Sequence, residues 1–234
     1  MFHFKQFSVD QSGCAMKINT DGVLLGSLAT ADDPKSILDI GTGTGVIALM
    51  LAQRFGNAQI DAVELDESAA ETAASNFKRS PFANRLMVYP LGFKEFFEAH
   101  PGNKYDLVVS NPPFYINSLL SPGAKKNQAK HAGDGFFEGL IQSVAEHLAD
   151  NGLCWLVLPP NAGALVKELA KQRGLYLQKI IYIHSFDTDA AHREVLVFGL
   201  QVAELSEDRL VIYDGPNVYS ALYQSVLKNF LTIF

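Results

Sequence analysis

Short apolar runs alternate with longer amphipathic stretches along most of this chain. The runs have the length and composition of strands, and they span residues 36–40, 60–64, 85–89, 105–110, 153–158, 175–184 and 194–203. Most of the stretches between them have helical periodicity and end near glycine or proline, as 46–55 and 66–78 do. Strands that alternate with helices are typical of a parallel sheet wrapped by helices. The pattern therefore predicts an α/β fold with seven strands.

Glycine and proline also mark two later helices. A helix that begins at Asp134 or Gly135 is predicted to end at Asn151-Gly152, a common helix stop. Near the end of the chain, Pro216 is predicted to occupy the first turn of a helix with apolar positions from Tyr219 to Phe230. A stripe of this kind more often packs into a core than binds a ligand. We expect 35–203 to be the main unit, flanked by extensions at 1–34 and 204–234.

Composition bounds the class of protein. The 234 residues are 48% hydrophobic and 19% charged, which excludes a disordered chain and allows a full core. The two cysteines, Cys14 and Cys154, are too far apart in sequence to suggest a disulfide framework or a metal site. The opening residues lack the apolar stretch of a signal peptide, and no run approaches membrane-spanning length. We expect a cytoplasmic protein without metal or membrane association, and the sequence leaves its oligomeric state open.

A glycine-rich loop follows the first strand. It reads Gly41-Thr42-Gly43-Thr44-Gly45, and Asp39 precedes it within the strand. Glycine allows close approach of a ligand to the backbone, although a tight turn without a ligand would look similar. A nicotinamide-binding loop would have its third glycine at Val46, and no phosphate-binding lysine follows. The loop therefore favours a nucleotide-like ligand of another kind.

Polar residues also end the second and fourth strands. Glu64 lies where a carboxylate can accept both hydroxyls of a ribose, while Asp66 is the better cap for the next helix. After the fourth strand comes Asn111-Pro112-Pro113-Phe114. Two prolines cannot continue a sheet ladder, so they present the Asn111 amide, the Pro112 carbonyl and the Phe114 ring in a stiff arrangement. Two acceptors beside an aromatic face suit a flat group that carries an NH2, and the three strand ends should line one crevice.

This ordered set of motifs resembles the class I S-adenosylmethionine-dependent methyltransferases, in the branch that methylates exocyclic or amide nitrogen. The resemblance covers about 35–203 and implies a Rossmann-like, mostly parallel seven-stranded sheet with one antiparallel strand. It implies S-adenosyl-L-methionine as cofactor, lying over the glycine loop, with Asp39 at its methionine end and Glu64 on its ribose. The cofactor contacts so implied are Asp39, Gly41, Thr42, Gly43, Gly45, Glu64, Leu65 and Asn111.

The flanking segments resemble one group within that branch. Phe4-Lys5-Gln6-Phe7, Ala15-Met16-Lys17 and the segment 20–26 are similar to the start of the bacterial tRNA (adenine-N6) methyltransferases, which modify the adenine 3′ of the anticodon in a valine tRNA. The resemblance implies a tRNA partner and an opening segment that folds over the cofactor, with Thr20 and Asp21 as its neighbours. Such enzymes usually carry an acid after the third strand, where this chain has Leu91-Gly92-Phe93. Either Phe93 packs on the cofactor adenine or Glu95 substitutes for the acid.

The motif suggests how an adenine amine could be methylated. Its two hydrogens would be accepted by the Asn111 side-chain oxygen and the Pro112 carbonyl, while Phe114 stacks on a base that has swung out of its loop. No general base is required, and His131 is better assigned to a backbone phosphate or to ordering its loop. The net charge is −6, but 119–132 carries basic residues and no acid, as an RNA contact or a solvated loop. Candidate RNA contacts are Pro113, Tyr115, Lys125, Lys126, Lys130, His131 and Lys5, with Lys17 as a helper.

The same motifs also occur in enzymes with other acceptors and bear on other classes of protein. Asn-Pro-Pro-aromatic also serves enzymes that methylate a release-factor glutamine or a ribosomal RNA guanine. The first usually carry a separate helical N-terminal domain and the second a duplicated half, and neither is expected here. A catalytically silent RNA-binding protein is disfavoured by the intact set of motif residues. A nicotinamide dehydrogenase is disfavoured by the glycine spacing.

Overall fold

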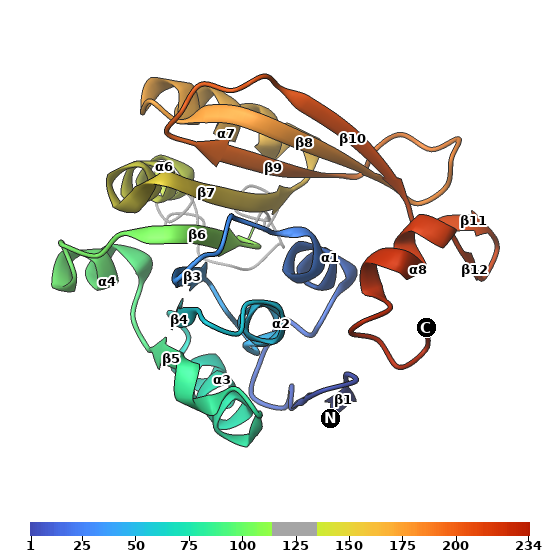
Figure 1. Cartoon of the computed structure of the whole chain (residues 1–234), viewed down its shortest axis with the longest axis horizontal. Coiled ribbons are helices and arrows are strands. Elements are labelled where there is room, and N and C mark those ends of the chain that lie inside the picture. The colour runs from blue at the N-terminus through green and yellow to red at the C-terminus, as the bar shows by residue number, and fades with distance from the viewer. Residues whose placement is uncertain (114–134) are drawn as a thin grey trace, which may run out of the picture.

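The computed structural model describes residues 1–113 and 135–234, which form a central sheet with helices on both faces (Figure 1). In these residues eight strands make up the sheet, in the order β10-β8-β9-β7-β6-β3-β4-β5. Their bounds are β3 Ser36–Ile40, β4 Gln59–Val63, β5 Leu86–Tyr89, β6 Tyr105–Ser110, β7 Leu148–Leu158, β8 Tyr176–His184, β9 Arg193–Gly199 and β10 Ser206–Val211. Strand β9 is antiparallel to β7 and β8, and the other pairs are parallel. The predicted mostly parallel α/β fold is confirmed.

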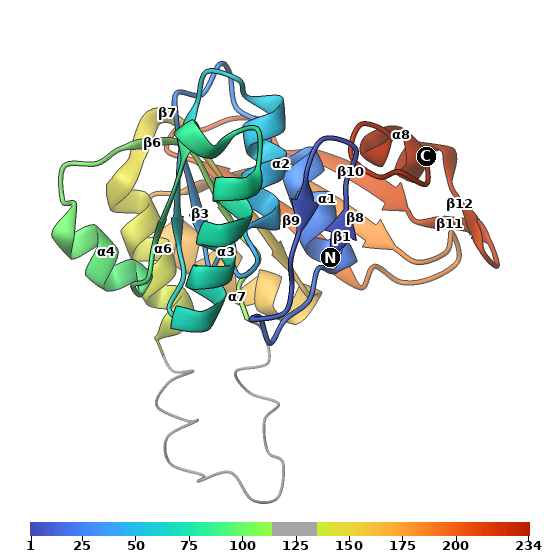
Figure 2. The same ribbon diagram turned by 90° about the horizontal axis from the view of Figure 1, so that it is seen from below.

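Two hydrophobic clusters hold the helices to opposite faces of the sheet (Figure 2). Side chains alternate along each strand, so in β6 Leu107 and Val109 join one cluster and Val108 joins the other. The first cluster takes in α1, α2, α3 and α8, and the second takes in α4, α6 and α7. The helix bounds are α1 Thr20–Leu28, α2 Val46–Arg54, α3 Glu67–Arg79, α4 Phe93–Ala99, α6 Phe136–His147, α7 Pro160–Gln172 and α8 Ala221–Leu227, and a short 3-10 turn spans Ala83–Arg85.

The sheet has one strand more than the sequence predicted. Strand β10 pairs in parallel with β8 at the edge, and its first four residues are exposed. Lys179 on β8 pairs with Asp208 on β10 at 2.6 Å. An edge strand pairs on one side only, and little of this one is buried. Its sequence is therefore charged and lacks the apolar run that predicts the inner strands. The expected count of seven was therefore too low.

The helix expected to end at Asn151-Gly152 ends earlier, at His147. Leu148 is fully buried and already pairs with Tyr105, so β7 begins there. The register of β7 against β6 then shifts between Tyr105 and Leu107. A Cβ at Gly152 would come within 2.6 Å of the Tyr105 carbonyl oxygen. Gly152 is therefore required by the close approach of two strands, and it does not stop a helix.

Pro216 likewise serves a turn instead of a helix start. It lies with Asn217 between two short strands, β11 (Tyr213–Gly215) and β12 (Val218–Tyr219). Asn217 adopts a left-handed backbone conformation with φ of 60°, which tight turns accept from asparagine. Helix α8 begins after Ser220, whose hydroxyl accepts a hydrogen bond from the Tyr223 amide at 3.1 Å. The predicted start of the last helix was therefore wrong by about one turn.

The two flanking segments meet one another. Near the N-terminus, β1 (Phe2–His3) and β2 (Ser8–Val9) form a small hairpin. Phe4 forms an isolated bridge with Leu231, and the Lys5 amide donates to the Phe230 carbonyl at 2.8 Å. Both ends of the chain therefore lie on one side of the molecule, on the face covered by α1 and α2 (Figure 1).

Candidate active site

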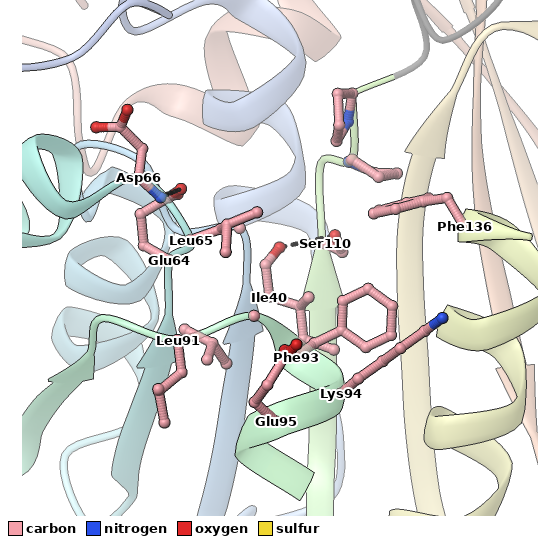
Figure 3. Close-up of a pocket in the computed structure, with 15 residues that line it drawn as sticks. Ile40, Glu64, Leu65, Asp66, Leu91, Phe93, Lys94, Glu95, Ser110 and Phe136 are labelled. Atoms are coloured by element: carbon pink, nitrogen blue, oxygen red, sulfur yellow. Dashed lines mark hydrogen bonds between the residues drawn. The ribbon is translucent and has the colours of Figure 1, made fainter. Parts of the chain in front are cut away.

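A cavity of about 570 Å³ opens at the carboxyl ends of β3, β4 and β6 (Figure 3). Parallel sheets commonly bind ligands at this edge, because the loops after the strands converge there. The residues that line the cavity are Ile40, Gly41, Val63, Glu64, Leu65, Asp66, Leu91, Gly92, Phe93, Lys94, Glu95, Ser110, Pro112, Pro113 and Phe136. The structure thus brings together the three strand ends that the sequence predicted to line one crevice.

The glycine loop leaves open space above its backbone. Gly41 and Gly43 have φ of 73° and 54°, and a Cβ at either position would meet no atom within 4 Å. Hydrogen bonds from the Gly41 and Thr42 amides to the Val63 carbonyl, at 2.8 and 3.1 Å, tie the loop to β4. Gly45 has a different role, since a Cβ there would come within 2.5 Å of the Phe77 ring. The backbone of the first two glycines therefore faces open space, and the third allows close packing of α3.

Asp39 braces this loop from within the protein. Its side chain is fully buried, and its Oδ2 accepts hydrogen bonds from the Thr42 hydroxyl at 2.6 Å and the Ala48 amide at 3.2 Å. Its Oδ1 is buried and has no partner in the described part of the chain. Burial raises the pKa of Asp39 to about 7, against the lowering effect of those two hydrogen bonds. One carboxylate oxygen is therefore left without a hydrogen bond from the described residues, next to the glycine loop.

Glu64 joins the end of β4 to the glycine loop. Its Oε2 accepts from the Gly43 amide at 2.8 Å, and its Oε1 accepts from the Asp66 amide at 3.0 Å. Asp66 itself caps α3, since its side chain accepts from the Ala69 amide at 2.8 Å. The adjacent Leu65 is 77% exposed in the cavity wall, where it offers an apolar surface. The predicted capping role of Asp66 is confirmed, and Glu64, which lines the cavity, stays the predicted ribose contact.

The wall formed by the first turns of α4 and α6 combines two aromatic rings with one carboxylate. Phe93 and Phe136 pack edge to face at 5.6 Å, and both line the cavity (Figure 3). The Glu95 carboxylate lies against the backbone of Gly92, because a Cβ at Gly92 would come within 2.3 Å of Glu95 Oε2. A carboxylate three residues after Gly92 therefore lines the cavity. The sequence left two alternatives, in which either Phe93 packs on the cofactor adenine or Glu95 replaces the usual acid. Both residues line the cavity, so both alternatives stay open.

Asn111 lies directly after β6, between Ser110 and Pro112, which both line the cavity. The Ser110 hydroxyl donates to the Ile40 carbonyl at 2.7 Å and holds the ends of β6 and β3 together. The Asn111 Oδ1 atom is buried without a described partner, and its Nδ2 faces Gly22 of α1, where a Cβ would lie 3.7 Å away. Predicted site residues outside the described residues are Phe114, Tyr115, Lys125, Lys126, Lys130 and His131.

Four predicted residues from the opening segment do not line the cavity. Thr20 and Asp21 begin α1, and Asp21 pairs with Arg193 of β9 at 2.7 Å. Lys17 donates to the carbonyls of Gln11 and Cys14, so it braces its own segment. Lys5 donates to the carbonyls of Lys228 and Phe234, and it shares a surface hollow with residues at the far end of α2 from the glycine loop.

Sequence reasoning missed Asn76, which links α3 to the site. Its side chain is fully buried, and its Nδ2 donates to the carbonyls of Thr44 and Asp10, both at 2.9 Å. Its Oδ1 accepts from the Asp10 amide at 2.8 Å and from Arg79 at 2.8 Å. A polar residue on the apolar face of α3, three positions after the buried Ala73, was the available signal. Phe136 was missed as well.

Residues 1–113 and 135–234 contain no group of three or more His, Cys, Asp or Glu side chains that could hold a metal ion. Among the helices of these same ranges, none is long and apolar enough to cross a membrane.

Comparison with known families identifies the chain. Residues 15–172 match the model of the methyltransferase small domain. The chain belongs to this methyltransferase family. The match runs from the opening segment through the glycine loop, β6 and α7, so it includes every described wall of the cavity.

Curated relatives of this methyltransferase match over nearly their full length. A protein of Pedobacter heparinus is 44% identical over 100% of this chain and 98% of its own, and one of Flavobacterium psychrophilum is 42% identical over 98% of each. Both are named tRNA1(Val) (adenine(37)-N6)-methyltransferase. The resemblance seen in the sequence motifs is thereby confirmed.

Solved structures support the fold. A crystal structure from Agrobacterium tumefaciens, described as a predicted O-methyltransferase, has a TM-score of 0.68 at 21% identity and covers 90% of this chain and 96% of its own. A methyltransferase from Pyrococcus furiosus has a TM-score of 0.53 at 23% identity over 82% and 91%. At these identities the likeness concerns the fold alone, which is that of the class I methyltransferases.

The methyl donor of this family, S-adenosyl-L-methionine, fits the residues present. Open space above Gly41 and Gly43 leaves room for a ligand against the backbone. The unpartnered Oδ1 of Asp39 can accept from an ammonium group, and Glu64 can accept from hydroxyls at the cavity rim. Apolar wall residues, Leu65 and Phe93 among them, suit a purine ring.

Proposed function

We propose that this chain transfers a methyl group from S-adenosyl-L-methionine to the exocyclic N6 amine of an adenine in tRNA. By analogy with its curated relatives, the target is the adenine at position 37 in the anticodon loop of a valine tRNA. The observation that carries the proposal is the buried, unpartnered amide oxygen of Asn111 beside the cavity. An acceptor held in this way suits an NH2 group. Its place of action would be the cytoplasm.

Asn111 would raise the reactivity of the target amine. An adenine amine is a poor nucleophile, because its lone pair is delocalised into the ring. Asn111 Oδ1 and the Pro112 carbonyl would accept its two hydrogens, which localises the lone pair and stabilises the positive charge that develops on nitrogen. The cofactor supplies an electrophilic methyl group on a sulfonium. Phe114 would stack on the base, so most of the rate comes from positioning.

The RNA would be held by aromatic and basic residues that follow Pro113 in the chain. A base in a stacked anticodon loop must swing out to reach the cavity, where aromatic side chains receive it. Tyr115 is a second candidate platform beside Phe114. The basic run 125–131 would contact the flanking phosphates, and no titrating general base is required, because the methylated amine loses its proton readily to water.

Replacement of the catalytic amide tests the assigned role. We expect Asn111→Ala to lower the rate of methyl transfer by at least about 10²-fold, as loss of one preorganised polar group does elsewhere. The dissociation constant for the cofactor should stay within about threefold, because the glycine loop is untouched. Rates come from transfer of labelled methyl to tRNA, and binding from calorimetry. Asn103→Ala, a change remote from the cavity, is the control, and full turnover in Asn111→Ala would refute the role.

The substrate is tested with bulk tRNA from cells that lack this protein. Incubation with labelled S-adenosyl-L-methionine, followed by nucleoside analysis, should give N6-methyladenine in one tRNA species. Label in ribosomal RNA or in a release factor, with none in tRNA, would keep the Asn111 chemistry and overturn the acceptor. Saturable cofactor binding without transfer to any of the three would favour a silent binding protein.

A further inference from the structure

The start of helix α1 is held by an ion pair to a distant strand. Asp21 lies in the first turn of α1, where a carboxylate is favoured by the helix dipole. Its Oδ2 is 2.7 Å from Nε of Arg193, and the two side chains are only 13% and 21% exposed. Asn19 caps the same turn by accepting from the Gly22 amide at 2.9 Å. Removing one partner from an ion pair shielded in this way leaves a partly buried charge uncompensated, which costs more than the loss of an exposed pair.

This ion pair lies at the edge of the sheet that carries the active site. Because β9 is antiparallel to β7, its first residue, Arg193, lies beside the carboxyl end of β7, where Glu194 pairs with Leu158. Strand β7 separates β9 from β6, and two strand spacings amount to about 10 Å. Helix α1 crosses this interval, since it packs on β7 and α2 (Figure 1). The ion pair therefore joins β9 to the neighbourhood of Asn111.

Gly22, the residue after Asp21, lies against the side-chain amide of Asn111. A Cβ at Gly22 would lie 3.7 Å from Asn111 Nδ2 and 3.5 Å from the capping Asn19 oxygen. The other end of the amide, Oδ1, has no hydrogen-bond partner within the described residues. The orientation of the amide therefore depends on packing against α1.

We propose that Arg193 is a positioning residue for methyl transfer. Through Asp21 it holds the first turn of α1 against Asn111, and so keeps the amide oxygen aimed at the target amine. This inference rests on the proposed function, in which Asn111 accepts hydrogens from that amine. Without Arg193, the shielded Asp21 carboxylate would lack its partner, and the first turn of α1 would shift toward water to hydrate it. Gly22 would move with it.

The adjacent residue on β9 provides a matched control. Glu194 points to the opposite face of the sheet and pairs with Lys167 of α7 at 2.7 Å, with side-chain exposures of 9% and 27%. Lys167→Gln therefore removes the cation of a similarly shielded ion pair one residue away. It leaves α1 and Asn111 untouched, so it separates loss of strand stability from loss of positioning.

The test compares Arg193→Gln, Arg193→Lys and Lys167→Gln in the full chain. We expect Arg193→Gln to lower kcat by about 10- to 100-fold, since small misplacements near the chemistry have effects of this size. KM for tRNA should stay within about threefold, as expected when an interaction acts mainly in the transition state. Arg193→Lys keeps the charge and should restore most of kcat, and Lys167→Gln should keep it. Hydrogen exchange of residues 19–28 should accelerate in Arg193→Gln alone.

Several results would overturn the inference. Unchanged kcat, or unchanged exchange at 19–28, would show that the ion pair does not position the amide. An equal loss of kcat in Lys167→Gln would indicate general destabilisation of β9. A rise in KM alone, with a salt dependence of binding lowered by about one unit, would make Arg193 a phosphate contact. If the wild-type protein methylates no tRNA, the proposed function fails, and the exchange experiment still decides whether Arg193 holds α1.

Discussion

Asp39 has both carboxylate oxygens inside the protein, one bound to the glycine loop and one without a described partner. Burial raises its pKa from 3.8 to about 7, so the free protein changes charge at this residue near neutral pH. Because the folded value lies above the unfolded one, the folded state holds more protons between these limits. Asp39 therefore makes the free protein less stable as the pH rises from about 4 to about 7.

The same shift predicts a pH dependence of cofactor binding. If Asp39 holds the ammonium of the methionine end, its ionised form binds the cofactor better, and ionisation increases about tenfold between pH 6 and 8 for a group with a pKa of about 7. We expect the dissociation constant for S-adenosyl-L-methionine to fall by up to about tenfold over this range. Calorimetry with Asp39→Asn should show a flatter profile. Identical profiles for the two proteins would exclude the contact.

At the scale of elements, the opening segment is fastened to α3 and to its own turns. Asn76 on α3 bonds both backbone groups of Asp10, and the Ser68 hydroxyl donates to the Gly13 carbonyl at 3.0 Å. Within the segment, the Gln11 side chain accepts from the Ile18 amide at 2.8 Å. Polar contacts thus hold the segment 10–19 in place between α3 and the cap of α1. The hydrophobic patterns of strands and helices do not predict such contacts.

Asn76 should be the most sensitive of these links. We expect Asn76→Ala to lower the free energy of unfolding by about 2–4 kcal/mol, because it leaves the buried Thr44 carbonyl and the partly buried backbone groups of Asp10 without this partner. Cofactor affinity should fall as well, since Thr44 belongs to the glycine loop. Urea unfolding and calorimetry measure the two effects. Asn103→Ala removes one long hydrogen bond of 3.3 Å and should cost less than about 1 kcal/mol; equal losses would argue against the special role of Asn76.

For the whole molecule, charge distribution matters more than net charge. A chain of net charge −6 should bind tRNA with modest affinity that falls steeply with added salt. Replacing Lys125, Lys126 and Lys130 by Gln should lower the slope of log affinity against log salt by about two to three units. As a control, three lysines are replaced at the end of the sheet away from the cavity, namely Lys78, Lys104 and Lys171. This change removes the same number of charges and should leave the slope nearly unchanged. Equal slopes for both variants would exclude the basic run as the phosphate contact.

The sequence anticipated the elements that are built from local patterns. Strands β3, β4 and β6 and the residues at their ends were predicted nearly to the residue, because buried parallel strands are continuous apolar runs. Strand β10 and the turn at Pro216 were not, because an exposed edge strand has no such run and proline suits both turns and helix starts. The role of Gly152 depends on a carbonyl more than forty residues earlier, which no local pattern encodes.

The sequence by itself determined the methyltransferase fold and the order of the motifs, since period, glycine spacing and the Asn-Pro-Pro-Phe loop are local properties of the chain. Only the tertiary structure decided which neighbours these motifs receive. In the folded protein Asp39 is buried and its pKa is raised, and Gly45 allows α3 to pack closely on the loop. Asp21 pairs with Arg193, which lies 172 residues away in the sequence. Electrostatic shielding and side-chain packing depend on all the chain that surrounds a group, so they come into existence when distant segments meet.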